Sequence, residues 1–225
     1  MKKIFSFLAS FLPALTLCAV PFIAEQPVID GDLSEPVAQA TLRIVKVFWG
    51  LSSSLAYRRH FPAIDWLISY SLYADKLADW YVKNASADFI RLRAFAMQIL
   101  QEEAELDEIV RLVGADALSY KDRLTLETAK SIREDYLHQN AFHETDTYTS
   151  IEKQCGMLRL IYDFHRLAID AINRGADFNA LLTLPVREKI GRAKYIEEKN
   201  LSELATIAKE IKEQVKSLDG GEDNV

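Results

Sequence analysis

The stretch Tyr57–Tyr73, reading YRRHFPAIDWLISYSLY, is the most informative part of the chain, because an aromatic–proline step joins two amphipathic segments there. Pro62 disfavours helical geometry at the residue before it, so Phe61 is expected on a turn. The serine run 52–54 predicts the N-cap of a short helix in front of this turn. From Ile64 onward, residues recurring at spacings of three and four predict helix. The stretch therefore marks where an earlier, different kind of structure gives way to a helical bundle.

The remaining sequence predicts one strand and a series of helices. Residues 41–49 are rich in β-branched and aromatic side chains, which is typical of a strand. An apolar stripe from Ile90 continues to a glycine at 114, a suitable C-cap, and Ser119 is suited to cap the next helix. The expected helices cover residues 64–73, 90–113, 121–139, 151–173, 179–195 and 201–218.

Composition excludes several classes of function. The chain has 225 residues, 49% of them hydrophobic, and a net charge of −6 with its basic residues dispersed, so no basic stripe suits nucleic acid. Two cysteines are too few for a disulfide framework, and the histidines lack the spacing of zinc or di-iron sites. No nucleophile motif is present. We therefore expect no metal site and no catalytic residue in this chain.

Three runs carry a family resemblance: GDLSEPVAQATLRIVKVFWGL at 31–51, RHFPAI at 59–64 and QNAF at 139–142. From Gly31 to about Leu218 the chain resembles the C-terminal third of the catalytic A subunit of V-type and archaeal A-type rotary ATPases. The resemblance implies a mainly α fold, the C-terminal helical bundle of that subunit, with a leftover strand from the nucleotide-binding sheet near the N-terminus. This strand is expected to lack its sheet neighbours.

The resemblance also implies a binding role for two aromatic side chains. In the family, the aromatic residue of the HFPAI turn and that of the QNAF segment lie against the adenine of bound ATP or ADP. These positions correspond to Phe61 and Phe142, with Pro62 setting the angle of the first ring and Gln139 and Asn140 lining the other side, beside Ala141. From the pattern without the resemblance, two phenylalanines would be interpreted as core residues.

A second implied site is the segment GADALSYKD at 114–122, which resembles the helix–turn–helix tip that pushes on the central rotor stalk. Ala117, Leu118 and Ser119 match that pattern best, whereas Tyr120 and Lys121 depart from the acidic tips of related F-type machines. Without the resemblance this segment is an ordinary solvated helix connection. The implied partners are the B subunit and the central stalk.

The resemblance has clear limits. A phosphate-binding loop needs G-x-x-x-x-G-K-[ST], and the chain contains no Gly–Lys pair. Mg²⁺ is therefore expected only in the complete subunit, and the chain is not expected to turn over ATP by itself. The expected divisions are a signal-like or remnant segment (1–30), the end of the nucleotide-binding domain (31–63), the C-terminal helical domain (64–218) and a flexible tail (219–225).

The first segment leaves two interpretations. A charged start followed by a short apolar run is typical of a secretory signal, whereas the family works on the cytoplasmic face as a peripheral membrane complex. A broken or truncated gene accounts for this segment more simply than export. The alternative function is a non-catalytic, exported helical module that inherited the fold and binds proteins.

Overall fold

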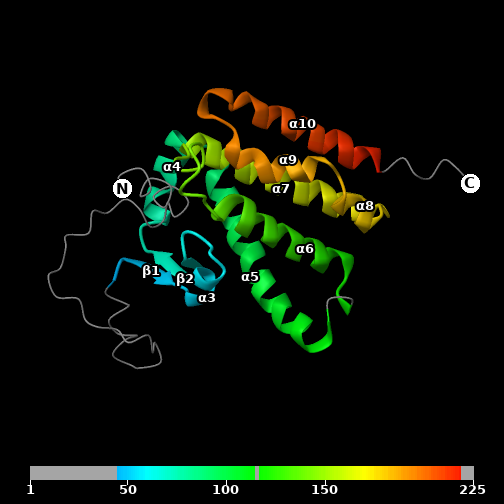
Figure 1. The fold of residues 1–225 in the computed structure, drawn as a ribbon, viewed down its shortest axis with the longest axis horizontal. Coiled ribbons are helices and arrows are strands. Elements are labelled where there is room, and N and C mark those ends of the chain that lie inside the picture. The colour runs from blue at the N-terminus through cyan, green and yellow to red at the C-terminus, as the bar shows by residue number, and fades with distance from the viewer. Residues whose placement is uncertain (1–44, 115–116, 219–225) are drawn as a thin grey trace, which may run out of the picture.

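The computed structural model describes residues 45–114 and 117–218, which form a helical bundle with a small sheet on one side (Figure 1). The N-terminal segment and the tail predicted at 219–225 lie outside the described residues. The long helices are α5 (Phe89–Val113), α6 (Tyr120–Ser131), α7 (Ile151–Asn173) and α10 (Ser202–Ser217). A π-helical turn, η3 (Ile132–Leu137), continues α6.

The bundle is organised around α7. Its buried face packs against α5 and α6 on one side and against α9 and α10 on the other. The apolar residues of α7 recur at helical spacing, so a single stripe reaches the core, and Leu158, Ala168 and Ala171 are at most 1% exposed. The predicted mainly α fold is confirmed.

Shorter elements complete the chain. They are α3 (Ser53–Tyr57), η1 (Asp75–Leu77), α4 (Ala78–Asn84), α8 (Phe178–Leu182), α9 (Val186–Arg192), η4 (Ala193–Tyr195) and η5 (Glu198–Asn200). The expected helix at 179–195 is thus wrong as one unit, because Pro185 lacks the backbone N–H that would continue α8. Helix α8 therefore ends at Thr183, and a separate helix, α9, begins directly after Pro185.

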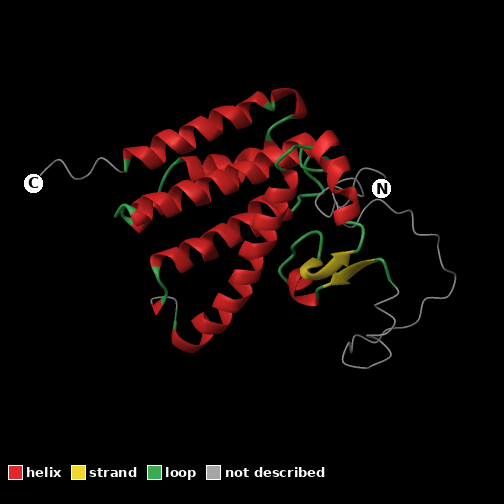
Figure 2. Ribbon diagram, turned by 180° about the vertical axis from the view of Figure 1, so that it is seen from behind, coloured by secondary structure: helices red, strands yellow, loops and turns green. Residues whose placement is uncertain are grey.

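The sheet corrects a second expectation. Residues 64–71 form a strand, β2 (Ile64–Ser71), rather than the start of a helix. It pairs antiparallel with β1 (Val47–Leu51), so the strand expected to have lost its neighbours has one within the described residues. Figure 2 shows this hairpin beside the bundle, and β2 contacts α5. Phe48 stacks on Tyr70 across the pair, a cross-strand contact that stabilises the register.

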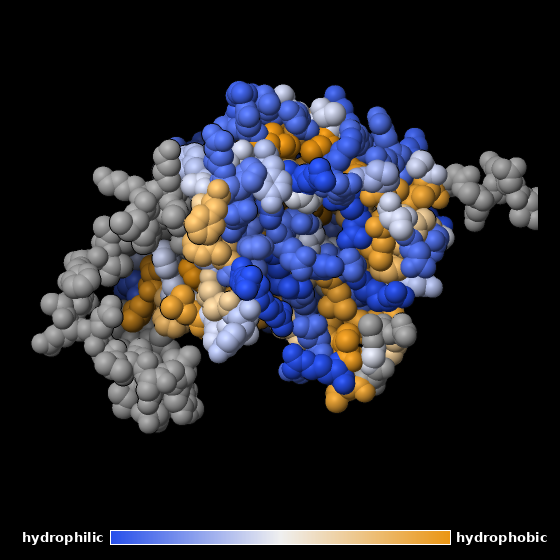
Figure 3. Space-filling view, in the orientation of Figure 1, coloured by the Kyte–Doolittle hydropathy of each residue, from blue (hydrophilic) through white to orange (hydrophobic). Residues whose placement is uncertain are grey.

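Within residues 45–114 and 117–218, no helix combines the length and the apolar content that crossing a membrane requires. Figure 3 shows hydrophobic surface over β1 and β2 and at the far end of the α5–α6 hairpin, with hydrophilic surface between them.

Candidate functional site

Two segments that are far apart in the sequence meet at the end of η3. The main-chain N–H of Gln139 donates a 2.7 Å hydrogen bond to the carbonyl of Phe61. The rings of His60 and His138 stack with their centroids 5.0 Å apart. The HFPAI turn and the QNAF segment are therefore neighbours, although their positions in the chain gave no direct sign of it.

The turn is also held by hydrogen bonds among residues that precede and follow Phe61. Ser52 caps α3 as the sequence predicts, its Oγ accepting from the N–H of Leu55, and its own N–H donates to the carbonyl of Ala63. The N–H of His60 donates to the carbonyl of Leu55. These bonds close the chain around Phe61, which lies outside helix and strand as expected.

The QNAF segment begins a loop, residues 138–149, that is held by its own polar groups. The Gln139 side chain is 1% exposed and its Nε2 donates to the carbonyls of Asp146 and Thr147 at 2.8 and 3.2 Å. The buried Asp146 carboxylate accepts a 2.6 Å bond from the N–H of Asn140. This pair of buried side chains determines where the following residues emerge at the surface.

The predicted site residues differ in exposure. Phe142 is fully exposed and Phe61 is 37% exposed, so neither ring is packed in the helical core. Pro62 is half-buried and Asn140 exposed, with its Oδ1 accepting from the N–H of Phe142. Gln139 is the exception, because its amide points into the loop. The buried Gln139 side chain is therefore suited to stabilising the loop rather than to forming the surface.

Charged and titratable groups lie at the end of η3, beside the stacked rings of His60 and His138. Lys194, from η4, donates to the carbonyls of Glu134 and His138 at 2.9 and 3.3 Å. The pKa of His138 is lowered, first by burial and then by the charges of His60 and Lys194. The Lys194 ammonium thus lies where the carbonyls at the end of η3 have no further helix to bond, which is where positive charge is favoured.

The predicted tip lies at the other end of α6, remote from the turn (Figure 1). Gly114 ends α5 at φ 86°, and Ser119 caps α6 with its Oγ accepting from the N–H of Asp122, both as the sequence predicts. Ala117 and Ser119 are exposed and Leu118 is half-buried. Residues 115–116 of the segment lie outside the described residues.

Comparison with known proteins places this arrangement in a family. The model of the C-terminal domain of V and A type ATP synthases matches residues 78–181, and the nucleotide-binding domain of the ATP synthase alpha/beta family matches residues 18–71. The V-type ATP synthase alpha chain of Acetivibrio thermocellus is 65% identical over 84% of this chain, and that of Thermoanaerobacter pseudethanolicus 62% identical over 85%. The chain belongs to the V- and A-type ATP synthase family.

Further comparisons define how much of the family the chain represents. The alpha chain of Clostridium botulinum strain Langeland is 61% identical over 84% of this chain. A solved structure, that of the ATP synthase subunit NeqB from Nanoarcheaum equitans, is similar with 23% sequence identity and a TM-score of 0.49. The match covers 61% of this chain and 32% of the NeqB chain. The chain spans about a third of the length of the alpha chains it matches. The junction between the two matched domains falls at residues 71–78, directly after β2.

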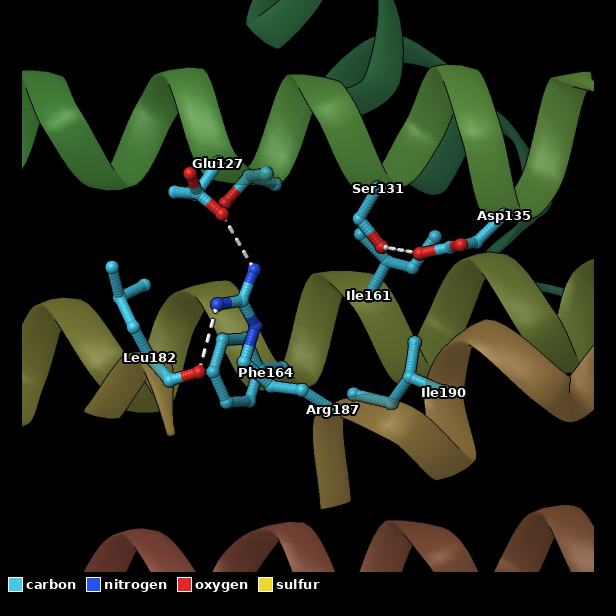
Figure 4. A pocket seen from close by; sticks show the side chains of 9 residues that line it. Glu127, Ser131, Asp135, Ile161, Phe164, Leu182, Arg187 and Ile190 are labelled. Carbon is cyan, nitrogen blue, oxygen red and sulfur yellow. Dashed lines mark hydrogen bonds and ion pairs between the residues drawn. The ribbon is translucent and has the colours of Figure 1, made fainter. Parts of the chain in front are cut away.

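This family member also has a partly open pocket of about 160 Å³ between α6, α7 and α9 (Figure 4). Arg187 crosses it, donating to Glu127 at 2.7 Å and to the carbonyl of Leu182 at 3.0 Å. At the other end Ser131 donates to Asp135 at 2.6 Å. Because these groups satisfy one another, the pocket is interpreted as a packing feature of the ATP synthase bundle.

Sequence reasoning missed several residues that hold the two segments of the candidate site together. His60 and His138 were not selected, although one belongs to the RHFPAI run and the other directly precedes QNAF. Asp146 was not selected either, and only its nearness to the QNAF run could have suggested it. Among the described residues, no group of three or more His, Cys, Asp or Glu side chains is arranged to hold a metal ion.

Proposed function

We propose that this chain forms the adenine side of a nucleotide site, together with a rotor-facing tip, in the alpha chain of a V- or A-type rotary ATP synthase. The observation that supports the first part is the 2.7 Å hydrogen bond from Gln139 to Phe61, which makes neighbours of the two segments that carry the aromatic rings. Family membership and the match to a nucleotide-binding domain support the choice of ligand.

The geometry suits the adenine part of ATP or ADP. A purine is flat and polarisable, and stacking on an aromatic side chain contributes about 1–3 kcal/mol per base. Phe61 and Phe142 supply exposed ring surface from the two joined segments. Pro62 restricts the backbone beside the first ring, and Gln139 and Asn140 hold the loop that presents the second. These features support adenine as the ligand of this surface.

The triphosphate does not fit the residues present. No Gly–Lys pair occurs in the sequence, so a phosphate-binding loop with its Mg²⁺-holding hydroxyl is expected only in the complete alpha chain. We propose that ATP hydrolysis or synthesis takes place there, and that this chain contributes binding and force transmission. It is not expected to be an enzyme by itself.

The α5–α6 hairpin is the proposed mechanical part. Packed helices move as units, so a closure at the adenine side can displace the tip at the far end of α6. Ala117, Leu118 and Ser119 are the proposed contacts with the central stalk, and the B subunit is the proposed neighbour across the nucleotide site. The movement would couple nucleotide turnover to transport of protons or sodium ions by a complex peripheral to the membrane on its cytoplasmic side.

Saturation-transfer difference NMR tests the adenine site, because it detects binding that is too weak for most other assays. With ADP added to the purified chain, we expect saturation at the adenine protons that falls in Phe61→Ala and in Phe142→Ala. Tyr120→Ala, which removes an exposed aromatic ring at the other end of α6, is the matched control and should keep the signal. Unchanged adenine saturation in both phenylalanine variants would refute the proposal.

Crosslinking tests the tip. In a chimera in which this chain replaces the C-terminal third of the Acetivibrio thermocellus alpha chain within its complex, Ser119→Cys should crosslink to a central-stalk subunit. Ser202→Cys, an exposed position on α10, is the control and should not. Equal labelling of the stalk from both positions would exclude the tip as the contact.

A further inference from the structure

The ring of His60 lies between two carbonyl groups. Its Nδ1 is 3.1 Å from the carbonyl oxygen of Pro62, and its Nε2 is 3.0 Å from that of Arg133. The first carbonyl belongs to the turn that carries Phe61, and the second belongs to η3. One side chain thus bridges the turn and the helical bundle.

The chemistry of these contacts determines how many protons the ring carries. A carbonyl oxygen only accepts hydrogen bonds, so each contact requires an N–H on the imidazole. A neutral histidine has one N–H and would direct the lone pair of its other nitrogen at an oxygen. Only the imidazolium form, with both nitrogens protonated, makes both hydrogen bonds.

The surroundings favour a cation at this point. The Arg133 carbonyl also accepts a 2.9 Å hydrogen bond from the N–H of His138, the residue at which η3 ends, so it lies near a helix C-terminus, where positive charge is favoured. The ring of Trp66 lies with its centroid 5.8 Å from that of His60, close enough for attraction between a cation and an aromatic face. On the other side His138 stacks at 5.0 Å, and its pKa is lowered by burial and by the charges of His60 and Lys194, which favours its neutral form.

Charges of both signs face the same hollow. Besides His60, the titratable side chains that line it are Arg58, directly after α3, then Arg133, Glu134 and Asp135 of η3, His138 directly after η3, and Lys194 and Tyr195 of η4. Arg133 is paired with Glu103, and Lys194 is bound to two carbonyls. The neighbouring cations are thus largely engaged with their own acceptors, and Glu134 and Asp135 supply negative charge.

From this geometry we propose that His60 is a positioning residue whose imidazolium form clamps the Phe61 turn onto the end of η3. The clamp operates beside the hydrogen bond from Gln139 to Phe61 and holds it closed. The clamp itself is a property of the chain without nucleotide. Its use, setting the angle of the first aromatic ring against adenine, rests on the function proposed above.

The clamp implies that docking of the turn depends on pH. Histidine changes its charge between about pH 5 and 8, so both donors are present at the acidic end of this range and one is lost at the alkaline end. The docked turn is therefore favoured at low pH and loosens as the pH rises. A turn held by packing or by backbone hydrogen bonds would not respond in this way.

Nitrogen chemical shifts of the histidine side chains test the protonation state directly in the wild-type chain. At pH 6 we expect both His60 nitrogens to show the shifts of protonated imidazolium, while His138 shows a neutral ring. A neutral single tautomer at His60 at pH 6 would overturn the proposal. This measurement needs no variant, so it does not depend on a substituted chain folding.

Hydrogen exchange of the Gln139 amide tests the clamp, because this N–H is the one bonded to Phe61. After correction for intrinsic exchange, its protection in the wild type should fall as the pH rises from 5 to 8. In His60→Gln, which keeps one donor without the charge, we expect about tenfold lower protection at pH 5 and no pH dependence. His143→Gln removes another imidazole of the 138–149 loop and should retain the wild-type profile.

Each result separates the clamp from the adenine site. A wild-type pH profile that persists in His60→Gln would overturn the clamp, whatever the nucleotide does. A profile that disappears in His60→Gln but persists in His143→Gln supports it, even if adenine saturation proves insensitive to Phe61. Amides of α7 serve as the internal reference, since an equal change there would mean global unfolding and would count against a local clamp.

Discussion

Arg133 forms a forked ion pair with Glu103, its Nε donating to both carboxylate oxygens at 3.1 Å and its terminal nitrogen lying 2.9 Å from one of them. This ion pair joins η3 to α5. Burial raises the pKa of Glu103, and the Arg133 guanidinium opposes that rise. Desolvation thus outweighs attraction, so the arginine is needed mainly because the carboxylate is buried.

We therefore predict an asymmetric result when each partner is removed. Arg133→Met should cost about 2–3 kcal/mol of unfolding free energy at pH 7, because it leaves a buried carboxylate without a counter-charge. Glu103→Gln should cost less, about 1 kcal/mol, because a neutral amide still accepts from Arg133. In the double variant the Arg133→Met penalty should shrink. Urea unfolding of the four proteins measures the coupling.

The pH dependence of Arg133→Met gives the check on this explanation. A carboxyl whose folded pKa is raised contributes stability below its unfolded value and loses it as the pH rises through the folded pKa. The defect of Arg133→Met should therefore be smaller at pH 4 than at pH 7. A defect that is equal at both values would mean that lost packing, rather than charge, explains the result.

A second prediction concerns His165 of α7. Burial lowers its pKa to about 4. The Thr128 hydroxyl donates to the carbonyl of Leu124 at 2.8 Å, so its oxygen accepts from Nδ1–H of His165, also at 2.8 Å. A histidine with a depressed folded pKa contributes stability above its unfolded pKa and loses it as the pH falls. Between pH 6.5 and 4 the wild type should lose about 2–3 kcal/mol relative to His165→Gln.

The measurement compares the unfolding free energy of the wild type and of His165→Gln as a function of pH. His165→Gln is suitable because it keeps a donor for Thr128 but does not titrate. His143→Gln, which changes a histidine of the 138–149 loop, should follow the wild type. If His165→Gln lost stability between pH 6.5 and 4 as steeply as the wild type, other groups would be responsible for the acid sensitivity.

The sequence predicted helix ends correctly where residues close in the chain determine them. Gly114 ends a helix and Ser52 and Ser119 begin helices where the sequence places caps, because a cap depends only on nearby backbone. It failed at residues 64–71, where spacings of three and four resemble a helix. Pairing with β1 decides this segment, and that partner lies beyond any local window.

The site was predictable only in part. The two aromatic segments were found through their resemblance to the family, but nothing local shows that the N–H of Gln139 reaches Phe61 or that His60 bridges to Arg133. Those contacts depend on how η3 ends against the turn, which is a property of the tertiary fold. Gln139 was expected to line the adenine, which stays a prediction, and its side chain is buried because its amide bonds the carbonyls of Asp146 and Thr147.

A third prediction addresses the connection that leads to the tip. Gly114 has φ 86° and ψ 159°, a backbone region that is open almost only to glycine. Among residues 45–114 and 117–218, no non-neighbouring atom lies within 4 Å of where its Cβ would be, so strain rather than a clash is the expected cost. Gly114→Ala should lower the unfolding free energy by about 1–3 kcal/mol in urea unfolding. Leu112→Ala, at a position 85% exposed, should cost little, and an equally small effect of Gly114→Ala would mean that the tip relaxes without strain.

The last prediction concerns the hairpin of β1 and β2, whose solvent-facing side chains are unusually apolar. Leu51 is 79% exposed, Leu67 44% and Leu72 54%. An exposed apolar patch on a short sheet favours association with other chains. We expect the chain to self-associate in sedimentation velocity, and we expect Leu67→Lys combined with Leu72→Lys to reduce the association.

The structure changes how this association can be relieved. Deleting residues 1–51 would remove β1 and leave β2 without its hydrogen-bonded partner, so this deletion should worsen association. Charged substitutions leave the pairing intact, because the ladder depends on the backbone. Leu112→Lys, at the exposed end of α5, is the matched control and should leave association unchanged. A wild-type chain that stays monomeric across the concentration series would show that the hairpin surface is not adhesive.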